Sequence, residues 1–425
     1  MTKGFASGFG EPLSEEGKRY VNEVRLKLTQ PIHPTFDTDF NIYRFVLSSE
    51  RIHKKEKDII EHAAKAVNNH LRIRKSLNLD TDVPRAFDEN PIFQKRLMPK
   101  GEIQEQSDSY NRLLWFIEYA SITVESIAHS IRSSEACKYQ FWQFEYMLRR
   151  VMKQEEKTGK LSSLRHVIDM HGYEINPFTM LFVSSGTLAY YSQLFHYENY
   201  PELVSPVEIV NIAKWIHVPY KLAKTMMPSG FADKFRLHDN HFLKTLKEEI
   251  RLEDIPESLG GVNKTIKCVP AVKVEHTDYW QPDQNEIIND LESVHVGARK
   301  NKHITVEINE PKEIKWYFRT DGDVYFGIFY EDPDKKVQEE KDGFDHEKFE
   351  MVYPWLKLSA KLVHERDSFR CTVPGKYHIV FCNKHSWLSR RNVDLFVQIV
   401  DAENNKKRLH SDGTLAQSTV DINVQ

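Results

Sequence analysis

The sequence predicts a multidomain chain with a helical unit, an α/β domain and an all-β sandwich, in that order. Three observations predict this fold class. Apolar residues recur at helical spacing over residues 14–80, strand and helix patterns alternate over 85–262, and short β-branched or aromatic runs separated by turn residues fill 303–401. We expect a polar linker over 263–302 and a polar, flexible tail over 402–425.

Composition and charge narrow the class of protein. The chain has 425 residues, 40% hydrophobic and 28% charged, which is ordinary for a soluble globular protein. The net charge of −3 gives no support for a nucleic-acid partner. The first ten residues lack a secretory signal pattern, and no apolar run approaches the roughly 20 residues of a membrane helix. We therefore expect a cytoplasmic protein whose membrane contact is peripheral and transient.

Cysteine and histidine spacing gives no metal or redox motif. The four cysteines are scattered and form no Cys-x-x-Cys pair, so we expect reduced thiols. His166, Asp169 and His171 lie close together, but no His-Glu-x-x-His pattern or ligand-rich helix supports a metal. Ser184-Ser185-Gly186 is not a nucleophile elbow. We expect no catalytic residues, no metal and no enzyme.

The helical unit begins near Ser14, a plausible N-cap, and continues through apolar positions such as Ile42 and Val67. Nine basic residues, here called the basic fringe, lie on or near its predicted helices. Either these side chains form a solvated face, or they meet anionic lipid headgroups. The fringe consists of Arg51, His53, Lys54, Lys55, Lys57, Lys65, Arg72, Arg74 and Lys75.

The α/β domain is predicted from alternating patterns that imply a parallel or mixed sheet. We expect strands at 112–119, 166–169 and 207–212, and helices at 134–154 and 177–197. A further helix at 214–227 has apolar residues on more than one face. It therefore either fills a protein core or covers something apolar that is not protein. Its apolar residues are Trp215, Ile216, Val218, Tyr220, Leu222, Met226 and Met227.

Several of these segments resemble the CRAL-TRIO lipid-binding family. The similar stretches are Tyr200-Pro201-Glu202, the strand after it, the helix at 214–227, and Ile255-Pro256-Glu257-Ser258-Leu259-Gly260-Gly261. The resemblance implies a cavity for one lipid, closed by a gate that the apolar residues of 214–227 form. It also implies that Tyr200, Glu202 and Lys234 contact the lipid headgroup, since Lys234 follows Glu202 by 32 residues as in the family. The alternative is that Glu202 and Lys234 form a simple salt bridge or are two unrelated solvent-facing charges.

The N-terminal unit departs from that family at one place. Arg44 is retained, but Ser48 and Ser49 stand where the family usually has a later basic pair. This departure weakens the phosphate end of the inositol-lipid site that the resemblance implies.

The predicted sandwich resembles a GOLD (Golgi dynamics) domain. The similar residues are Trp316-Tyr317-Phe318, Asp321-Gly322, Pro374-Gly375 and Phe381-Cys382-Asn383. CRAL-TRIO followed by GOLD is the order found in lipid carriers of the supernatant protein factor group. The resemblance implies a carrier of phosphatidylinositol, phosphatidylcholine or an isoprenoid, with no cofactor besides the bound lipid. The alternative is a membrane-trafficking adaptor whose sandwich binds a protein partner.

Overall fold

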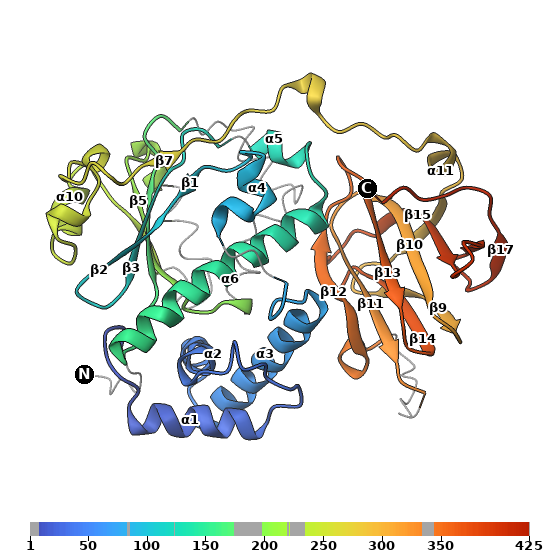
Figure 1. Cartoon of the computed structure of the whole chain (residues 1–425), viewed down its shortest axis with the longest axis horizontal. Coiled ribbons are helices and arrows are strands. Elements are labelled where there is room, and N and C mark those ends of the chain that lie inside the picture. The colour runs from blue at the N-terminus through green and yellow to red at the C-terminus, as the bar shows by residue number, and fades with distance from the viewer. Residues whose placement is uncertain are drawn as a thin grey trace.

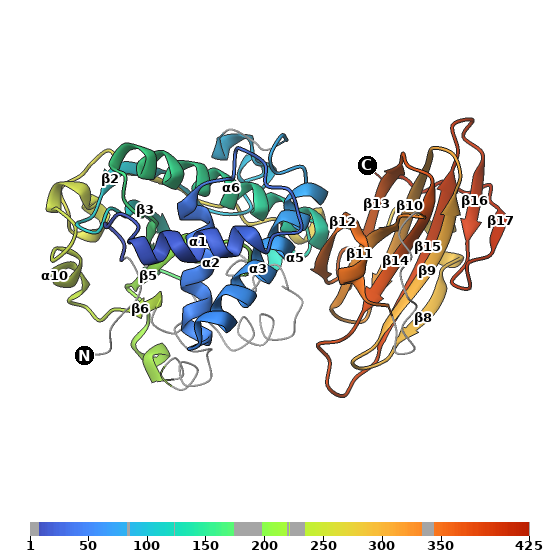
Figure 2. The same ribbon diagram turned by 90° about the horizontal axis from the view of Figure 1, so that it is seen from below.

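The computed structural model places the helical unit against the α/β domain, with the sandwich beside both (Figures 1 and 2). The residues it describes are 8–82, 86–122, 124–173, 198–218, 221, 234–333 and 344–424.

Three helices form the N-terminal unit. They are α1 (Glu15–Leu26), α2 (Asp39–Ile52) and α3 (Glu56–Ser76). The Ser14 hydroxyl accepts a hydrogen bond from the Gly17 amide at 3.0 Å, which confirms the predicted N-cap. The apolar stripes of the helices meet in one core, where Ile42 and Val67 are completely buried.

A five-stranded sheet forms the centre of the α/β domain, in the order β2-β3-β4-β5-β6. Only β2 is antiparallel to its neighbour. The predicted strands and the helix at 134–154 are confirmed, while the predicted helix at 177–197 lies outside the described residues. The bounds are β2 (Ile103–Ser107), β3 (Leu113–Glu118), β4 (Leu164–Asp169), β5 (Val204–Val210), β6 (Phe235–Leu237) and α6 (Ser133–Thr158).

Short elements complete this domain and the segment that follows it. On one face of the sheet, Phe116, Val167 and Val210 pack with Leu246 of α10. These elements are η1 (Phe87–Glu89), α4 (Pro91–Gln94), β1 (Lys100–Gly101), α5 (Val124–Ala128), η3 (Lys214–Ile216), α10 (Phe242–Leu246), η5 (Leu252–Asp254), η6 (Glu257–Leu259), β7 (Cys268–Val269), η7 (His276–Asp278) and α11 (Asn285–Asn289).

The C-terminal part is a pair of antiparallel sheets. One has the order β13-β10-β15-β16-β17 with β8 also on β15, and the other has the order β12-β11-β14-β9. Trp316, Phe318, Phe326 and Phe381 fill the core. The strands are β8 (Glu292–Val296), β9 (Asn301–Ile308), β10 (Lys312–Thr320), β11 (Val324–Glu331), β12 (Glu350–Leu358), β13 (Glu365–Cys371), β14 (Gly375–Cys382), β15 (Arg391–Val400), β16 (Lys406–Leu409) and β17 (Leu415–Gln417), with η8 (His346–Lys348) before β12.

The expected linker and flexible tail need correction. Strand β8 lies inside the expected linker and pairs with β15, while β16 and β17 lie inside the expected tail and extend the same sheet. The physical reason is that this sheet is apolar on its outer face as well. Tyr317 and Phe396 point outward there, and Ile287 of α11 and Ile422 of the tail bury them.

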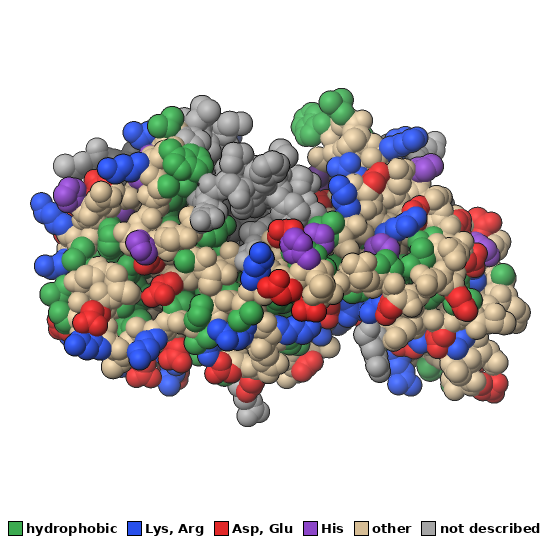
Figure 3. All heavy atoms as spheres, turned by 90° about the horizontal axis from the view of Figure 1, so that it is seen from above, with side chains coloured by type: hydrophobic (Ala, Val, Ile, Leu, Met, Phe, Trp, Pro, Cys, Tyr) green, Lys and Arg blue, Asp and Glu red, His purple; other side chains and the backbone are tan. Residues whose placement is uncertain are grey.

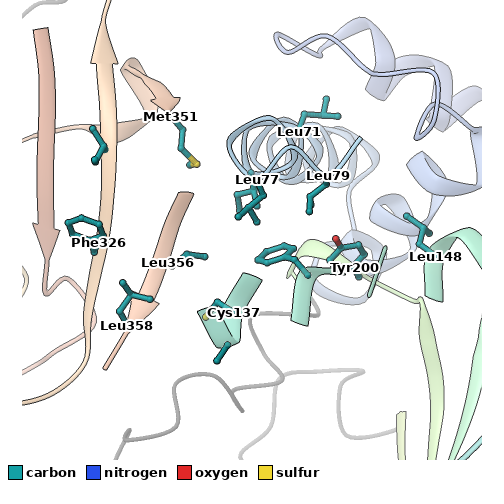
Figure 4. Close-up of a cluster of buried hydrophobic side chains, with 14 of the residues drawn as sticks. Leu71, Leu77, Leu79, Cys137, Leu148, Tyr200, Phe326, Met351, Leu356 and Leu358 are labelled. Carbon is teal, nitrogen blue, oxygen red and sulfur yellow. The ribbon is translucent and has the colours of Figure 1, made fainter. Parts of the chain in front are cut away.

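The sandwich and the first two parts share one buried apolar cluster. Helix α3 and the N-terminal end of α6 contact β12, and Figure 4 shows side chains from both sides facing one another across the junction. Leu71, Leu77, Leu79, Cys137, Leu148 and Tyr200 come from one side, and Phe326, Met351, Leu356 and Leu358 from the sandwich. The three parts therefore pack as one body.

Part of the basic fringe belongs to this junction. Arg72 donates hydrogen bonds to the carbonyl oxygens of His346 and Phe349 at 2.8 and 2.7 Å, and Lys75 pairs with Glu350 at 2.5 Å. Arg74 is buried and pairs with Glu145. Arg74 is therefore not part of a solvated face or a lipid patch, and Arg72 and Lys75 bind the sandwich, although the Lys75 side chain stays largely exposed.

Candidate functional site

Glu202 is the centre of a buried cluster of charges. It lies in the turn before β5, in the left-handed backbone region with φ 56°. The guanidinium of Arg51, near the end of α2, donates from Nε to Oε1 at 2.9 Å and from Nη2 to Oε2 at 3.1 Å. The ammonium of Lys234, next to β6, lies 2.8 Å from Oε1. Because β5 and β6 are neighbouring parallel strands, the fold brings Glu202 and Lys234 together, as the family resemblance implied.

Burial and charge act in opposite directions on this cluster. Burial works to raise the pKa of Glu202, but the charges of Lys234 and Arg51 outweigh it and hold that pKa below the ordinary 4.5. Burial lowers the pKa of Lys234, and Glu202 offsets part of that effect. With Glu202 and Lys234 buried and Arg51 about one-third exposed, the cluster carries one negative and two positive charges.

Sequence reasoning missed Arg51 as a partner of Glu202. We expected Arg51 to belong to the basic fringe, and we interpreted Ser48 and Ser49 as a loss of positive charge. Arg51, near the end of α2, instead lies close to the start of β5. Its planar guanidinium donates two parallel hydrogen bonds to the Glu202 carboxylate. A basic residue at the last turn of a predicted helix was the available signal.

Tyr200 lies in the protein core. Its hydroxyl donates to Oε1 of Glu145 at 2.8 Å, and its ring stacks on Phe144 with centroids 5.2 Å apart. Burial, followed by the charge of Glu145, raises the pKa of Tyr200 well above its ordinary value. Figure 4 shows the ring within the apolar cluster. Its expected contact with a lipid headgroup stays a prediction.

The gate expected at 214–227 is described only at its beginning. Trp215 and Ile216 lie in η3, and Val218 follows it; the exposed fractions of Trp215 and Val218 are 53% and 74%, and Ile216 is half-buried. Tyr220, Leu222, Met226 and Met227 lie outside the described residues. For Trp215 and Val218, filling a protein core is excluded as an explanation, because both are at the surface.

One face of the sheet carries a buried histidine among apolar side chains. The rings of His166 and Trp115 stack with centroids 3.7 Å apart, and burial lowers the pKa of His166 to about 3. Its Nε2 makes no hydrogen bond within the part of the chain that the structure describes. Asp169 instead accepts from Asn211 and from the His171 amide. Over the described ranges, no three side chains gather as metal ligands.

The lipid chamber itself stays a prediction. A groove of about 410 Å³ lies beside β2, but its lining, which includes Glu102, Gln104 and Arg150, is mostly polar. This groove is not the apolar chamber that the family resemblance implies. Among the helices of the described residues, none combines the length and apolarity needed to cross a bilayer.

Comparison with known proteins identifies the central domain. Residues 98–261 match the CRAL/TRIO domain, so the chain contains a CRAL/TRIO domain. Residues 13–82 match a domain of unknown function, DUF8435, and residues 278–410 match an F28H7.8-like C-terminal domain. The C-terminal match is not to a GOLD domain, so the GOLD resemblance stays a proposal.

Two relatives come from Caenorhabditis elegans. The chain is 24% identical over 372 residues to the CRAL-TRIO domain-containing protein F28H7.8, which covers 87% of each chain. It is 22% identical over 310 residues to Protein ctg-1, covering 69% of this chain and 77% of the relative. Among solved structures, that of Sfh5 matches 57% of this chain and 79% of its own with a TM-score of 0.36 and 14% identity.

Proposed function

We propose that this chain is a cytoplasmic lipid-transfer protein that holds one lipid in the CRAL/TRIO domain and meets membranes transiently. The observation that carries the proposal is the buried cluster of Glu202, Lys234 and Arg51 inside a CRAL/TRIO domain. The surface position of Trp215 and Val218 supports the gate, since such side chains can face lipid.

The charge of the cluster favours a phospholipid headgroup. Glu202, Lys234 and Arg51 place one carboxylate and two cations together, and groups of these kinds can bind a phosphate and hydroxyl groups. A phosphodiester supplies a negative charge that the two cations attract. An inositol ring supplies hydroxyls that both donate and accept hydrogen bonds. Phosphatidylinositol therefore fits better than phosphatidylcholine or a neutral isoprenoid.

The energetics explain why a carrier is needed. A diacyl lipid has about 30 methylenes, each worth about 0.8 kcal/mol out of water, so a bare lipid in water is unfavourable by about 24 kcal/mol. An enclosed apolar site removes most of that cost. Transfer from bilayer to protein is then nearly balanced, and the protein acts by lowering a kinetic barrier. This role requires no catalytic residue and no cofactor besides the lipid.

The test combines lipid identification with a matched pair of variants. Protein purified from cells is extracted with organic solvent and analysed by mass spectrometry, and we expect one equivalent of lipid. The double variant Glu202→Gln/Lys234→Met removes the Glu202–Lys234 ion pair and leaves the partly exposed Arg51 as the remaining charge of the cluster. It should lower phosphatidylinositol binding at least about tenfold while sparing phosphatidylcholine. Arg236→Ala, two residues from Lys234 and paired with Glu208 instead, is the control. Equal losses for both lipids would contradict the headgroup assignment.

The same extraction distinguishes the carrier from the adaptor. The aromatic side chains of β11 and β14, such as Phe326, Phe329 and Phe381, are buried in the sandwich. They offer no docking surface to a protein partner. A protein that carries no lipid from cells and accepts none from vesicles would favour the adaptor, with the sandwich as a GOLD-type module.

A further inference from the structure

The loop between β14 and β15 holds two adjacent apolar side chains out in water. The exposed fractions of Trp387 and Leu388 are 77% and 97%. Isolated exposed apolar residues are common on protein surfaces, but a tryptophan beside a leucine at the tip of one loop is a concentrated apolar feature. Figure 3 shows hydrophobic side chains projecting from the sandwich at the upper edge of that view.

The loop is held rigidly beneath these two side chains. The Asn383 side-chain amide donates to the carbonyl oxygens of Val296 and Ser389 at 3.2 and 2.9 Å. The Ser386 hydroxyl donates to the same Ser389 oxygen at 2.7 Å and accepts from the Ser389 amide at 3.2 Å. The two residues between these serines are therefore the tip of a closed turn. A loop so ordered presents Trp387 and Leu388 at little further entropic cost.

Positive charges surround the base of the tip. The adjacent segments 297–303 and 383–391 contain no Asp or Glu. The guanidinium of Arg299 lies 4.0 Å from the centroid of the Trp387 ring and so accompanies it. Asp323, near the base of the loop, is already paired with Lys357 at 3.2 Å. The basic residues of the two segments are Arg299, Lys300, Lys302, Lys384, Arg390 and Arg391.

We propose that the Trp387–Leu388 tip is a membrane anchor that inserts into the headgroup region of an anionic bilayer. Tryptophan prefers that region, and each Lys or Arg near an anionic surface adds about 1 kcal/mol of attraction. Two side chains on a convex tip are too small for a stable protein interface, which takes about 800 Å² from each partner. A bilayer accepts such a tip without a complementary pocket.

The position of the tip suits a protein that touches a bilayer with two domains. Figure 3 shows a second group of hydrophobic side chains over the CRAL/TRIO domain at the same edge of the view, and η3 extends toward the corresponding lower edge of Figure 2. Trp215 of η3 and Val218, which follows η3, are exposed. The anchor would hold the CRAL/TRIO domain at the membrane; it rests on the proposed function only in that a lipid carrier must meet a bilayer.

Vesicle co-sedimentation of the full chain tests the anchor. Vesicles of phosphatidylcholine with about 30% phosphatidylserine should bind the wild-type protein, and Trp387→Ser/Leu388→Ser should lower the partition coefficient at least about tenfold. Lys384→Gln/Arg390→Gln should lower it about fivefold for each charge removed, on these vesicles and not on pure phosphatidylcholine. Leu26→Ser, an exposed leucine at the end of α1, is the matched control and should bind normally.

Two results would overturn the anchor: no binding of the wild-type protein to the anionic vesicles, or equal binding of the tip variant. Each variant should keep the wild-type melting temperature, because the substituted residues are exposed, and thermal melting checks this. Lipid extracted from the same preparations separates the two proposals. A wild-type protein that carries lipid, with a tip variant that binds vesicles normally, leaves the carrier standing and removes the anchor. If the wild-type protein carries no lipid but loses vesicle binding when the tip is changed, the carrier proposal is wrong and the anchor proposal stands.

Discussion

The buried carboxyl group of Glu365 should make the stability of this protein depend on pH. Glu365 is the first residue of β13 in the sandwich, and its side chain reaches the N-terminal end of α6. Its oxygens accept from the Ser134 amide at 2.9 Å and from the Ser134 hydroxyl at 2.5 Å. Burial raises the pKa of Glu365 to about 7, although Ser134 and Arg132 act to lower it and only Glu135 adds to the rise.

The direction of the effect follows from proton binding. Because the pKa of Glu365 is about 7 in the folded protein and about 4.5 when unfolded, only the folded state holds this proton between those values. The free energy of unfolding therefore falls as the pH rises through this window. Between pH 5 and pH 8 the contribution of Glu365 amounts to about 2–3 kcal/mol.

A neutral replacement isolates this contribution. Glu365→Gln keeps the shape of the side chain and stays uncharged, so its stability relative to wild type should rise by about 2–3 kcal/mol from pH 5 to pH 8. Chemical denaturation of the full chain at each pH, followed by fluorescence, measures the difference and cancels the groups common to both proteins. Glu350→Gln, at the exposed rim of the same junction, is the control and should show little change. Parallel pH profiles for wild type and Glu365→Gln would refute the reasoning.

Three further outcomes follow from the described contacts. Ile216→Asp/Val218→Asp should slow vesicle-to-vesicle lipid transfer without lowering the melting temperature, since Val218 is exposed and Ile216 half-buried; unchanged transfer would contradict the gate. Burial lowers the pKa of His166 to about 3 from an ordinary 6.5, so the free energy of unfolding should fall as the pH drops below 6.5. The NMR resonances of the His166 ring should therefore not titrate between pH 8 and pH 5, and a titration midpoint near 6.5 would disprove the burial of this ring. Ile422→Ala should cost about 2–4 kcal/mol in denaturation, whereas Leu415→Ala, on the exposed β17, should cost far less; equal losses would contradict the packed tail.

Local patterns were sufficient to predict the class of each part. Helical periodicity and the cap at Ser14 located the first helix, and β-branched runs located β10, β11 and β15. Strands β12 and β13 were not predicted. β13 carries charged or polar residues at most positions, whereas β12 is largely apolar but contains Pro354, a residue that the interior of a strand rarely tolerates.

Average polarity did not predict the structure of segments in which a few apolar residues cover a neighbouring apolar surface. The segments expected to be linker and tail are polar on average, yet Ile287 and Ile422 cover Tyr317 and Phe396. A single buried isoleucine in each segment hardly changes the average polarity. The need for a cover becomes visible only once β10 and β15 are side by side.

The sequence by itself determined the order of three parts, the strands β3, β4 and β5 of the central sheet and the spacing between Glu202 and Lys234. These features depend on residues near one another in the chain or on a regular repeat. Only the tertiary structure decided that Arg51 completes the charge cluster, that Arg72 and Lys75 face the sandwich, and that Glu365 caps a helix of another domain. The physical reason is that a charged side chain looks the same in sequence whether it meets water or a distant partner, and its partner is set by how the domains pack.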